Sequence, residues 1–309
     1  MRILFISSNL IGDSIISTGI LSYLCQNNKD SKITIVTGPT AKELFENYPN
    51  VEKIIVVKKM KYNLHWINLW IQLIKKKWNL VIDLRSSFMG YFILSKERKI
   101  FRNTNESITQ VEKLSNFLNL NQILSPKIYC NNQDRKIANS LIKNKIVFAI
   151  APGGNWPPKI WPAENYNKLI ISLQKLYPQK RIHFLITGST NEKDKYFEKV
   201  IKNISEDSII NIMGNSLNIT YACYELCKAF IGNDSGLMHL SAAAGINTIG
   251  LFGPTRDDWY RPYGEKCYVL RTKESFIELR KELKDSSKSL MSSITVDQVI
   301  ELIMKKNII

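Results

Sequence analysis

The sequence predicts an α/β protein made of two similar halves, each a doubly wound, Rossmann-like parallel sheet. Three observations support this fold class. At 309 residues the chain is long for one core, because domains usually hold about 100–200 residues. Short β-branched runs alternate with longer amphipathic stretches, and this order requires parallel strands joined by helical crossovers. The alternation restarts after residue 145, so we expect domains at 1–145 and 146–290, with a terminal helix in 291–309 packed on the body.

The first half repeats a strand-then-helix unit from its N-terminus. Each expected strand is a short run rich in Ile, Leu and Val, and each expected helix has apolar residues at helical spacing. The predicted strands are 3–6, 32–36, 53–57 and 80–83, and the predicted helices are 14–28, 41–47 and 64–77.

The second half repeats the same order after a polar segment, 131–145, which we expect to form a helix and a linker. A helical face of Val296, Val299, Ile300 and Ile303 indicates a final helix at 295–306. The other predicted strands and helices follow the same two periodicities. The strands are 146–150, 181–187, 209–212, 229–232 and 248–252, and the helices are 163–176, 192–204, 217–228 and 237–244.

The formal net charge of +16 has two interpretations. It favours an anionic partner, such as a phosphorylated sugar or an acidic lipid surface. It also fits a compositional bias, because the chain is rich in Lys, Asn and Ile and poor in Arg. Basic and aromatic residues do not interleave, so we predict no nucleic-acid partner.

The five cysteines do not predict disulfides, because their number is odd and the chain is large. Cys223 and Cys227, four residues apart, could form half of a metal site, but no second Cys or His pair lies nearby. We therefore expect buried, small apolar side chains, no metal, and a reducing, cytoplasmic location.

No stretch approaches the ~18 apolar residues of a membrane-spanning helix. The segment 64–81 comes nearest, but Lys75, Lys76 and Lys77 interrupt it. The apolar run at the N-terminus is too short for a signal peptide. Any membrane contact is therefore expected to be peripheral.

The turn after strand 229–232 is the strongest candidate binding loop. Asp234, Ser235 and Gly236 follow the strand directly and open a helix, and the free N–H groups at a helix start suit a pyrophosphate. Asp234 could accept from a ribose hydroxyl or cap the helix. His239 could contact phosphate or pack in the core.

The loop 151–162 is the second candidate. Gly153 and Gly154 allow a ligand to approach the backbone closely, and Lys159 offers a point charge for a diphosphate. The alternative is a rigid elbow between domains. The turn Gly253-Pro254-Thr255 could shape a phosphate or base pocket, but such turns are common.

Other strand-end residues have a structural and a chemical interpretation. Gly12 and Asp13 open the first helix, so Asp13 is either an N-cap or a general base for an attacking hydroxyl. Arg85 follows a strand and could meet an anionic acceptor. Glu192 could bind ribose or start a helix, and Met213 could flank a nucleobase or lie in a plain turn.

Four motifs, in order along the chain, resemble the ADP-heptose:lipopolysaccharide heptosyltransferases, glycosyltransferase family nine. They are Ile11-Gly12-Asp13, Lys159-Ile160-Trp161-Pro162, Leu251-Phe252-Gly253-Pro254-Thr255 and the most specific one, Asn233-Asp234-Ser235-Gly236-Leu237-Met238-His239-Leu240-Ser241-Ala242-Ala243. The sequence departs from many relatives after the Gly-Pro-Thr strand, where only Cys267 remains of several cysteines.

The resemblance implies a GT-B fold, in which the two sheets face a central cleft, and an inverting transfer that needs no metal or other cofactor. It implies that the first half serves the acceptor and the second half binds the nucleotide sugar. Asp13 becomes the general base and Lys159 stabilises the leaving diphosphate. The implied nucleotide-sugar contacts are Gly12, Gly153, Gly154, Glu192, Met213, Asp234, Ser235, Gly236 and His239, and Arg85 is the implied acceptor contact.

The implied partners are an ADP-sugar donor, ADP-heptose, and an anionic lipopolysaccharide inner-core acceptor, with peripheral contact at the inner membrane. Alternatives are a transferase of the same fold that uses another nucleotide sugar, and a non-catalytic nucleotide-sugar-binding protein. A UDP-sugar epimerase is disfavoured because the chain has only three His. A Rossmann dehydrogenase is disfavoured because no Gly-x-Gly-x-x-Gly opens the first helix.

Overall fold

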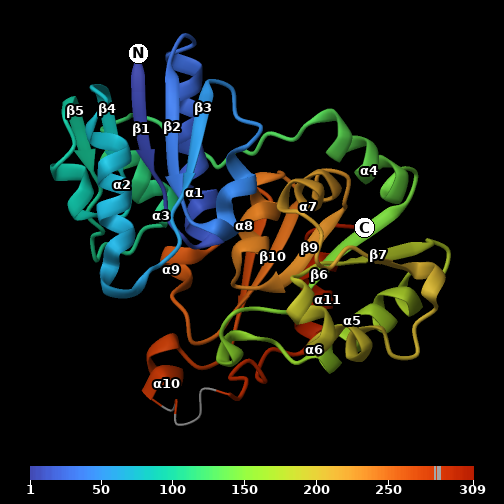
Figure 1. Ribbon diagram of the computed structural model, residues 1–309. Helices are drawn as coiled ribbons and strands as arrows, with labels where there is room; N and C mark the ends of the chain where they lie inside the picture. The colour runs from blue at the N-terminus through green and yellow to red at the C-terminus, as the bar shows by residue number, and fades with distance from the viewer. Residues whose placement is uncertain (282, 284–286) are drawn as a thin grey trace. The chain divides into compact units, whose positions relative to one another are not determined.

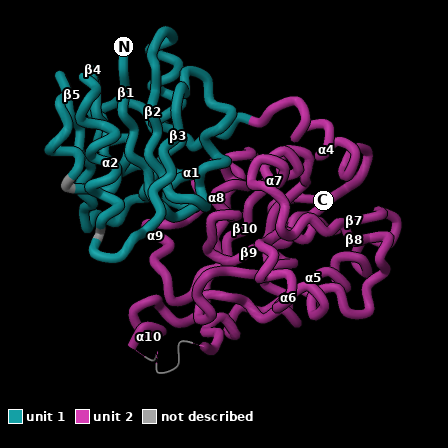
Figure 2. Tube along the Cα trace, viewed as in Figure 1, with its two compact units in different colours: residues 1–129 teal, residues 130–309 magenta. Residues whose placement is uncertain are grey.

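The computed structural model describes residues 1–281, 283 and 287–309. The chain divides into two compact units, Met1–Tyr129 and Cys130–Ile309 (Figure 2). Within the described ranges, no helix combines the length and the apolar character that a membrane crossing requires.

The first unit contains a five-stranded parallel sheet in the order β3-β2-β1-β4-β5 (Figure 1). Its core lies where buried strand residues meet the helices, with Ile3, Leu4 and Phe5 fully buried on β1. The elements are β1 (Arg2–Ile6), α1 (Ile11–Asn27), β2 (Lys32–Thr37), η1 (Pro39–Phe45), β3 (Val51–Val56), η2 (Lys61–Asn63), α2 (Leu64–Ile74), β4 (Trp78–Asp83), η3 (Phe88–Tyr91), β5 (Ser95–Ile100) and α3 (Gln110–Phe117).

The second unit contains a six-stranded parallel sheet in the order β11-β10-β9-β6-β7-β8. The elements are α4 (Asn132–Ile142), β6 (Ile146–Ala151), η4 (Pro157–Lys159), α5 (Ala163–Leu176), β7 (Ile182–Ile186), α6 (Thr190–Ile201), η5 (Glu206–Ser208), β8 (Ile209–Asn211), α7 (Leu217–Tyr224), β9 (Ala229–Asn233), α8 (Gly236–Ala243), β10 (Asn247–Phe252), α9 (Asp257–Tyr260), β11 (Cys267–Arg271), α10 (Phe276–Lys281) and α11 (Val296–Lys305). Helix α5 packs on α6 and on α11, and helix α7 packs on α4 and on α8.

Each parallel sheet has one switch point, where the strands stop being added on one side of the first strand and continue on its other side. In the first unit, β1 is followed by β2 and β3 on one side and by β4 and β5 on the other. In the second unit, β6 and β9 are the corresponding neighbours. Ligands of open α/β sheets bind outside the carboxyl ends of the strands at this point. The loops after β1, β4, β6 and β9 are therefore the informative ones.

The predicted strands and most predicted helices are confirmed; one predicted helix is of another type, and strands β5 and β11 were not predicted. The helix expected near 41–47 is a 3₁₀ helix at Pro39–Phe45. Strand β5 was not expected, because it is a charged edge strand with the sequence Ser-Lys-Glu-Arg-Lys-Ile. In the polar segment 131–145, α4 is confirmed as a helix, and it packs on α7 of the second unit.

The C-terminal helix packs as the sequence predicts. Val299 and Ile303 of α11 are fully buried, and α11 contacts α5. The segment before α11 is anchored as well, because the indole nitrogen Nε1 of Trp161 donates to the carbonyl oxygen of Ile294 at 2.9 Å. The 151–162 loop and the segment before α11 are thus tied to each other within the second unit.

Candidate functional site

The side-chain amide of Asn233 holds the 151–162 loop against the end of β9. Its Oδ1 accepts from the backbone N–H of Trp161 at 2.8 Å and from the hydroxyl of Tyr166 at 3.0 Å. Its Nδ2 donates to the carbonyl oxygens of Pro152 and Gly153 at 3.1 and 2.9 Å. Asn233 is fully buried, and two donated and two accepted bonds use the whole capacity of an amide. The loop is therefore fixed in place and belongs to the second unit, so the interdomain elbow is the wrong interpretation.

Lys159 and Asp234 form an ion pair at the switch point of the second sheet. The Nζ of Lys159 lies 3.6 Å from the Oδ2 of Asp234, and their side chains are only 14% and 9% exposed. The pair joins the loop after β6 to the loop after β9, and the register aligns Ala151 of β6 with Gly232 of β9. Two residues that are 75 positions apart in the sequence thus meet at one strand edge.

His239 is the third charged or polar group of this cluster. Burial lowers the pKa of His239 from its usual 6.5 to about 4; the Asp234 carboxylate opposes this shift, and Lys159 adds to it. The imidazole is therefore neutral at physiological pH and presents one donor and one acceptor nitrogen. His239 is buried, at 6% exposure, as the alternative of a core histidine predicts. Its imidazole also interacts electrostatically with Lys159 and Asp234.

The start of α8 leaves polar groups without internal partners. Ser235 takes the N-cap position, but its side chain makes no capping hydrogen bond. Its Oγ is buried and has no hydrogen-bond partner in the described chain. Gly236 is the first helical residue, where backbone N–H groups have no intrahelical acceptor. The expectation that Asp234 caps the helix is wrong, and the open donors suit an anion.

Gly153, Glu192 and Met213 come together beside this cluster. A Cβ added at Gly153 would lie 2.4 Å from the Cδ of Glu192, and one at Gly188 would lie 2.7 Å from the Cε of Met213. The loops after β6, β7 and β8 therefore converge. A Cβ at Gly154 would approach Ile160 at 3.3 Å, which is tight but less severe.

The helix-start interpretation of Glu192 is confirmed. Glu192 is the third residue of α6, and with Ser189 it forms a capping box: its Oε2 accepts from the Ser189 N–H at 2.6 Å. This task occupies one carboxylate oxygen, while the carboxyl group also lies against Gly153. A ribose contact of Glu192 stays a prediction.

In the first unit, Gly12 and Asp13 lie in the first turn of α1. The N-cap is Leu10, so the expectation that Asp13 is the N-cap is wrong. The hydroxyl of Ser8 donates to the Oδ2 of Asp13 at 3.2 Å. An acidic residue in the first helical turn interacts favourably with the helix dipole.

Arg85 is held beside the same loop by the buried Asp83. The two Asp83 carboxylate oxygens accept from the backbone N–H groups of Arg85 and Ser87, both at 2.9 Å. Burial raises the pKa of Asp83, and hydrogen bonds from Ser87 and Arg85 oppose the rise. The Arg85 guanidinium donates to the Oδ1 of Asn9 at 3.1 Å. Because β1 and β4 are neighbours, Arg85 and the Asp13 loop lie at one edge of the first sheet.

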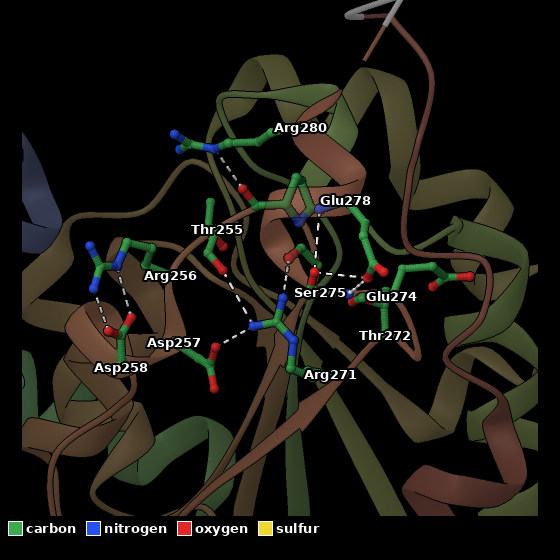
Figure 3. A network of polar contacts seen from close by, with 12 residues as sticks. Thr255, Arg256, Asp257, Asp258, Arg271, Thr272, Glu274, Ser275, Glu278 and Arg280 are labelled. Atoms are coloured by element: carbon green, nitrogen blue, oxygen red, sulfur yellow. Dashed lines mark hydrogen bonds and ion pairs between the residues drawn. The ribbon is translucent and has the colours of Figure 1, made fainter. Parts of the chain in front are cut away.

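A network of three arginines braces the turn after β10 (Figure 3). Arg271 donates to the carbonyl oxygen of Gly253 at 2.6 Å and pairs with Asp257, and Arg280 donates to the carbonyl oxygen of Pro254 at 3.0 Å. Arg256 pairs with Asp258. This turn follows β10, the neighbour of β9, so the braced turn and the start of α8 lie at the ends of adjacent strands.

Sequence reasoning assigned no role to Asn233 or to the arginine network. Asn233 stood inside the most specific motif, which was the one available signal. The arginines lie in a region where the sequence offered no motif. Among the described residues, no group of three or more His, Cys, Asp or Glu is placed to hold a metal, and Cys223 and Cys227 are buried as expected.

A sequence model described as glycosyltransferase family 9 (heptosyltransferase) matches residues 70–289. The chain is 26% identical over 271 residues to lipooligosaccharide heptosyltransferase 2 of Campylobacter jejuni, which covers 83% of this chain and 82% of that protein. It is 24% identical over 347 residues to the protein of the same name from Haemophilus ducreyi, which covers 97% and 98%.

Two solved structures share the fold. A family 9 glycosyltransferase from Veillonella parvula aligns with a TM-score of 0.79 and 22% identity, over 98% of this chain and 96% of its own. The Escherichia coli ADP-heptose lipopolysaccharide heptosyltransferase II aligns with a TM-score of 0.74 and 19% identity, over 99% and 100%. The GT-B fold expected from the sequence is confirmed.

Proposed function

Since this chain belongs to glycosyltransferase family 9, the heptosyltransferases, we propose that it transfers a heptose from ADP-heptose to an inner-core acceptor of lipopolysaccharide or lipooligosaccharide. The names of the relatives support the sugar and the acceptor. Two related Escherichia coli structures contain ADP and ADP-2-deoxy-2-fluoro heptose, which supports the donor.

The Lys159–Asp234 pair at the start of α8 is the observation that carries the proposal. In the donor complex, the cation and the open N–H groups of the helix start face the diphosphate. Charge grows on the ADP as it leaves, and preorganised donors stabilise that charge without reorganisation. The Oγ of Ser235 and the neutral imidazole of His239 add hydrogen-bonding groups beside it. Lys159 and the N–H groups at the α8 start supply the donors for the diphosphate from the protein itself, which is why we propose a reaction that needs no metal.

Glu192 and Met213 complete the nucleotide site in the proposal. One Glu192 oxygen is used by the α6 cap, and the other accepts from a ribose hydroxyl. Met213, a flexible and polarisable side chain, lies against the adenine. Gly153 and Gly154 leave room for the nucleotide to approach the backbone. A side chain at Gly153 would also collide with Glu192.

In the proposed reaction, Asp13 takes the proton of the acceptor hydroxyl. The hydroxyl oxygen attacks the anomeric carbon, a new C–O bond forms, and the bond from that carbon to the diphosphate oxygen breaks. The electron pair leaves with ADP. Attack opposite to the leaving group inverts the anomeric configuration. Arg85 faces the phosphate or carboxylate groups of the acceptor, and the enzyme works at the cytoplasmic face of the inner membrane.

The proposal is tested first by ligand stabilisation. Purified protein is heated with ADP-, UDP- and GDP-sugars, including ADP-heptose, because a ligand at about 100 times its Kd stabilises the fold by about 2.7 kcal/mol. We expect a rise in Tm with ADP-heptose and ADP that UDP- and GDP-sugars do not produce. A selective rise with a UDP- or GDP-sugar would replace the donor, and release of ADP without any sugar transfer to inner-core acceptors would contradict the acceptor.

A further inference from the structure

Exposed apolar side chains are concentrated in one part of the first unit. Nine of the sixteen exposed large apolar residues of the described chain lie within residues 60–94. We call them the α2 surface: Met60, Tyr62, Leu64, Ile67, Trp70, Ile71, Tyr91, Phe92 and Leu94. Tyr62 is 91% exposed and Leu94 is 61% exposed. Large apolar side chains that gather on a protein surface mark a site of interaction.

Helix α2 is apolar on both of its faces. The inner face buries His65, Leu69 and Leu73, whereas Ile67 and Ile71, one turn apart, are exposed. A surface helix usually has a polar outer face. Trp70 joins this outer face to the segment after η3, because its indole nitrogen donates to the carbonyl oxygen of Phe92 at 3.3 Å. The helix and that segment therefore form one surface.

Basic residues predominate around the α2 surface, and the flanking acidic residues are Glu52, which pairs with Lys76, and Glu97 on β5. Between Glu52 and Asp83 the sequence has seven lysines and no acidic residue, and Asp83 itself is fully buried. Exposed lysines precede α2, at Lys58, Lys59 and Lys61, and others follow it, at Lys75 and Lys77. Lysines around an apolar face rich in Trp and Tyr are typical of proteins that lie on an anionic bilayer.

We propose that the α2 surface docks the first unit on an anionic phospholipid bilayer, with the exposed apolar side chains inserted among the lipids and the lysines on the headgroups. A protein partner would have to complement exposed apolar side chains and nearby lysines at once, whereas a bilayer with acidic headgroups offers apolar acyl chains to the first and negative charge to the second. The docking itself does not depend on the chemistry proposed above.

The docking surface is connected to the loops of the acceptor side. Trp66, on α2, stacks with the Arg85 guanidinium, whose Cζ lies 5.0 Å from the ring centroid. Arg85 in turn donates to Asn9, which precedes Gly12 and Asp13 in the same strand-end loop. Resting on the proposed function, this chain of contacts places the base near lipid-anchored sugars that stand on the bilayer.

Sedimentation with vesicles tests the apolar part. The full chain is mixed with vesicles of phosphatidylethanolamine and phosphatidylglycerol, and with vesicles of phosphatidylcholine alone. We expect the protein to sediment with the anionic vesicles and the Ile67→Glu/Ile71→Glu variant to lose at least about tenfold in partition. The matched control, Ile123→Glu/Ile277→Glu, changes two exposed isoleucines elsewhere and should bind like the parent.

A second pair of variants tests the charge. Each cation near an anionic surface changes partition by about fivefold, so Lys58→Gln/Lys59→Gln/Lys61→Gln should lose on the order of 100-fold, and added salt should release the parent. The control Lys168→Gln/Lys193→Gln/Lys202→Gln should lose far less. Equal loss in both lysine sets would overturn a localised surface, as would binding that the isoleucine variant retains.

Two further measurements separate the possible outcomes. Sedimentation velocity reports self-association, and a parent dimer that the isoleucine variant abolishes, without vesicle binding by the parent, would show that the surface joins two copies and would overturn the proposal. Nucleotide stabilisation of the docking variants should equal that of the parent. Vesicle binding without any ADP-heptose response would instead contradict the proposed function and leave docking supported.

Discussion

The Nζ of Lys159 lies 3.6 Å from the Oδ2 of Asp234, with both side chains almost buried. Taking two charges out of water is costly unless they are well compensated, so such a pair is weak evidence for stability and better evidence for a task. An anion that enters beside Lys159 competes with Asp234 for the same cation. Without ligand, Asp234 therefore balances the charge of Lys159, and in the proposed function a diphosphate takes over that interaction.

Loss of the cation should affect binding and rate together. We expect Lys159→Ala to lower kcat/KM by about 100-fold or more, the effect of removing one preorganised donor from a developing anion, and to weaken ADP binding. Steady-state kinetics and calorimetry with ADP measure the two effects. Lys168→Ala, at an exposed position outside the site, is the control. Parent-like kinetics in Lys159→Ala would remove Lys159 from the mechanism.

Asp13 should act on rate alone. Loss of a general base costs about 10²–10⁴-fold in rate, so we expect Asp13→Asn to lower kcat in that range while the Kd for ADP stays within about twofold. Ser8→Ala, which removes the hydroxyl that donates to Asp13, should have a much smaller effect. A fully active Asp13→Asn enzyme would show that the carboxylate serves only the start of α1.

Asn233 should be a large contributor to stability. Asn233→Ala removes the partner of four buried groups, and each unsatisfied group costs about 1–3 kcal/mol. We expect the free energy of unfolding to fall by about 3 kcal/mol or more, measured by urea denaturation. Asn247→Ala, which loses one exposed bond to Lys228, should cost less than about 1 kcal/mol. Similar costs for both variants would contradict the clamp.

His239 should make stability depend on pH between about 6.5 and 4. Its pKa is near 6.5 in the unfolded chain and about 4 in the fold, so the unfolded state binds the proton first as pH falls. The contribution to stability is therefore full above pH 6.5 and shrinks toward pH 4, by about 2 kcal/mol between pH 7 and pH 5. His239→Gln should show a shallower decline in urea titrations across that interval. If the stability of the parent and of His239→Gln fell equally with pH, a group other than His239 would take up the proton.

Turnover should not depend on a divalent metal. Lys159 and the N–H groups at the α8 start supply the positive charge that a metal would otherwise provide. The rate of ADP-heptose consumption is therefore expected to be the same before and after dialysis against a chelator. Activity that disappears on dialysis and returns with Mg²⁺ or Mn²⁺ would refute this prediction.

The sequence predicts features that depend on local order, and it does so well for the strand ends. Alternation of strands and helices locates the loops after β6 and β9, and the switch-point rule explains why Lys159 and Asp234 meet. The Ser189-x-x-Glu192 spacing is a capping-box signature, so the role of Glu192 in starting α6 was visible in the sequence.

Other features depend on distant contacts, and the sequence does not reveal them. The four bonds of Asn233 reach residues 67–81 positions away, and no local pattern encodes them. Strand β5 is charged because it forms a sheet edge, so its periodicity resembles that of a loop. In the sequence, the exposed and the buried apolar residues of α2 form one apolar run, and only the fold distinguishes its two faces.

All nucleotide-side candidates except Gly12 lie in residues 130–309, whereas Asp13 and Arg85 lie in residues 1–129. In the proposed function, donor preference and acceptor preference can therefore diverge by separate mutations. Hybrid enzymes that join the first half of one relative to the second half of another should exchange acceptors and keep their sugar nucleotide. A nucleotide-mimicking inhibitor would bind residues that do not change when mutations alter the acceptor preference.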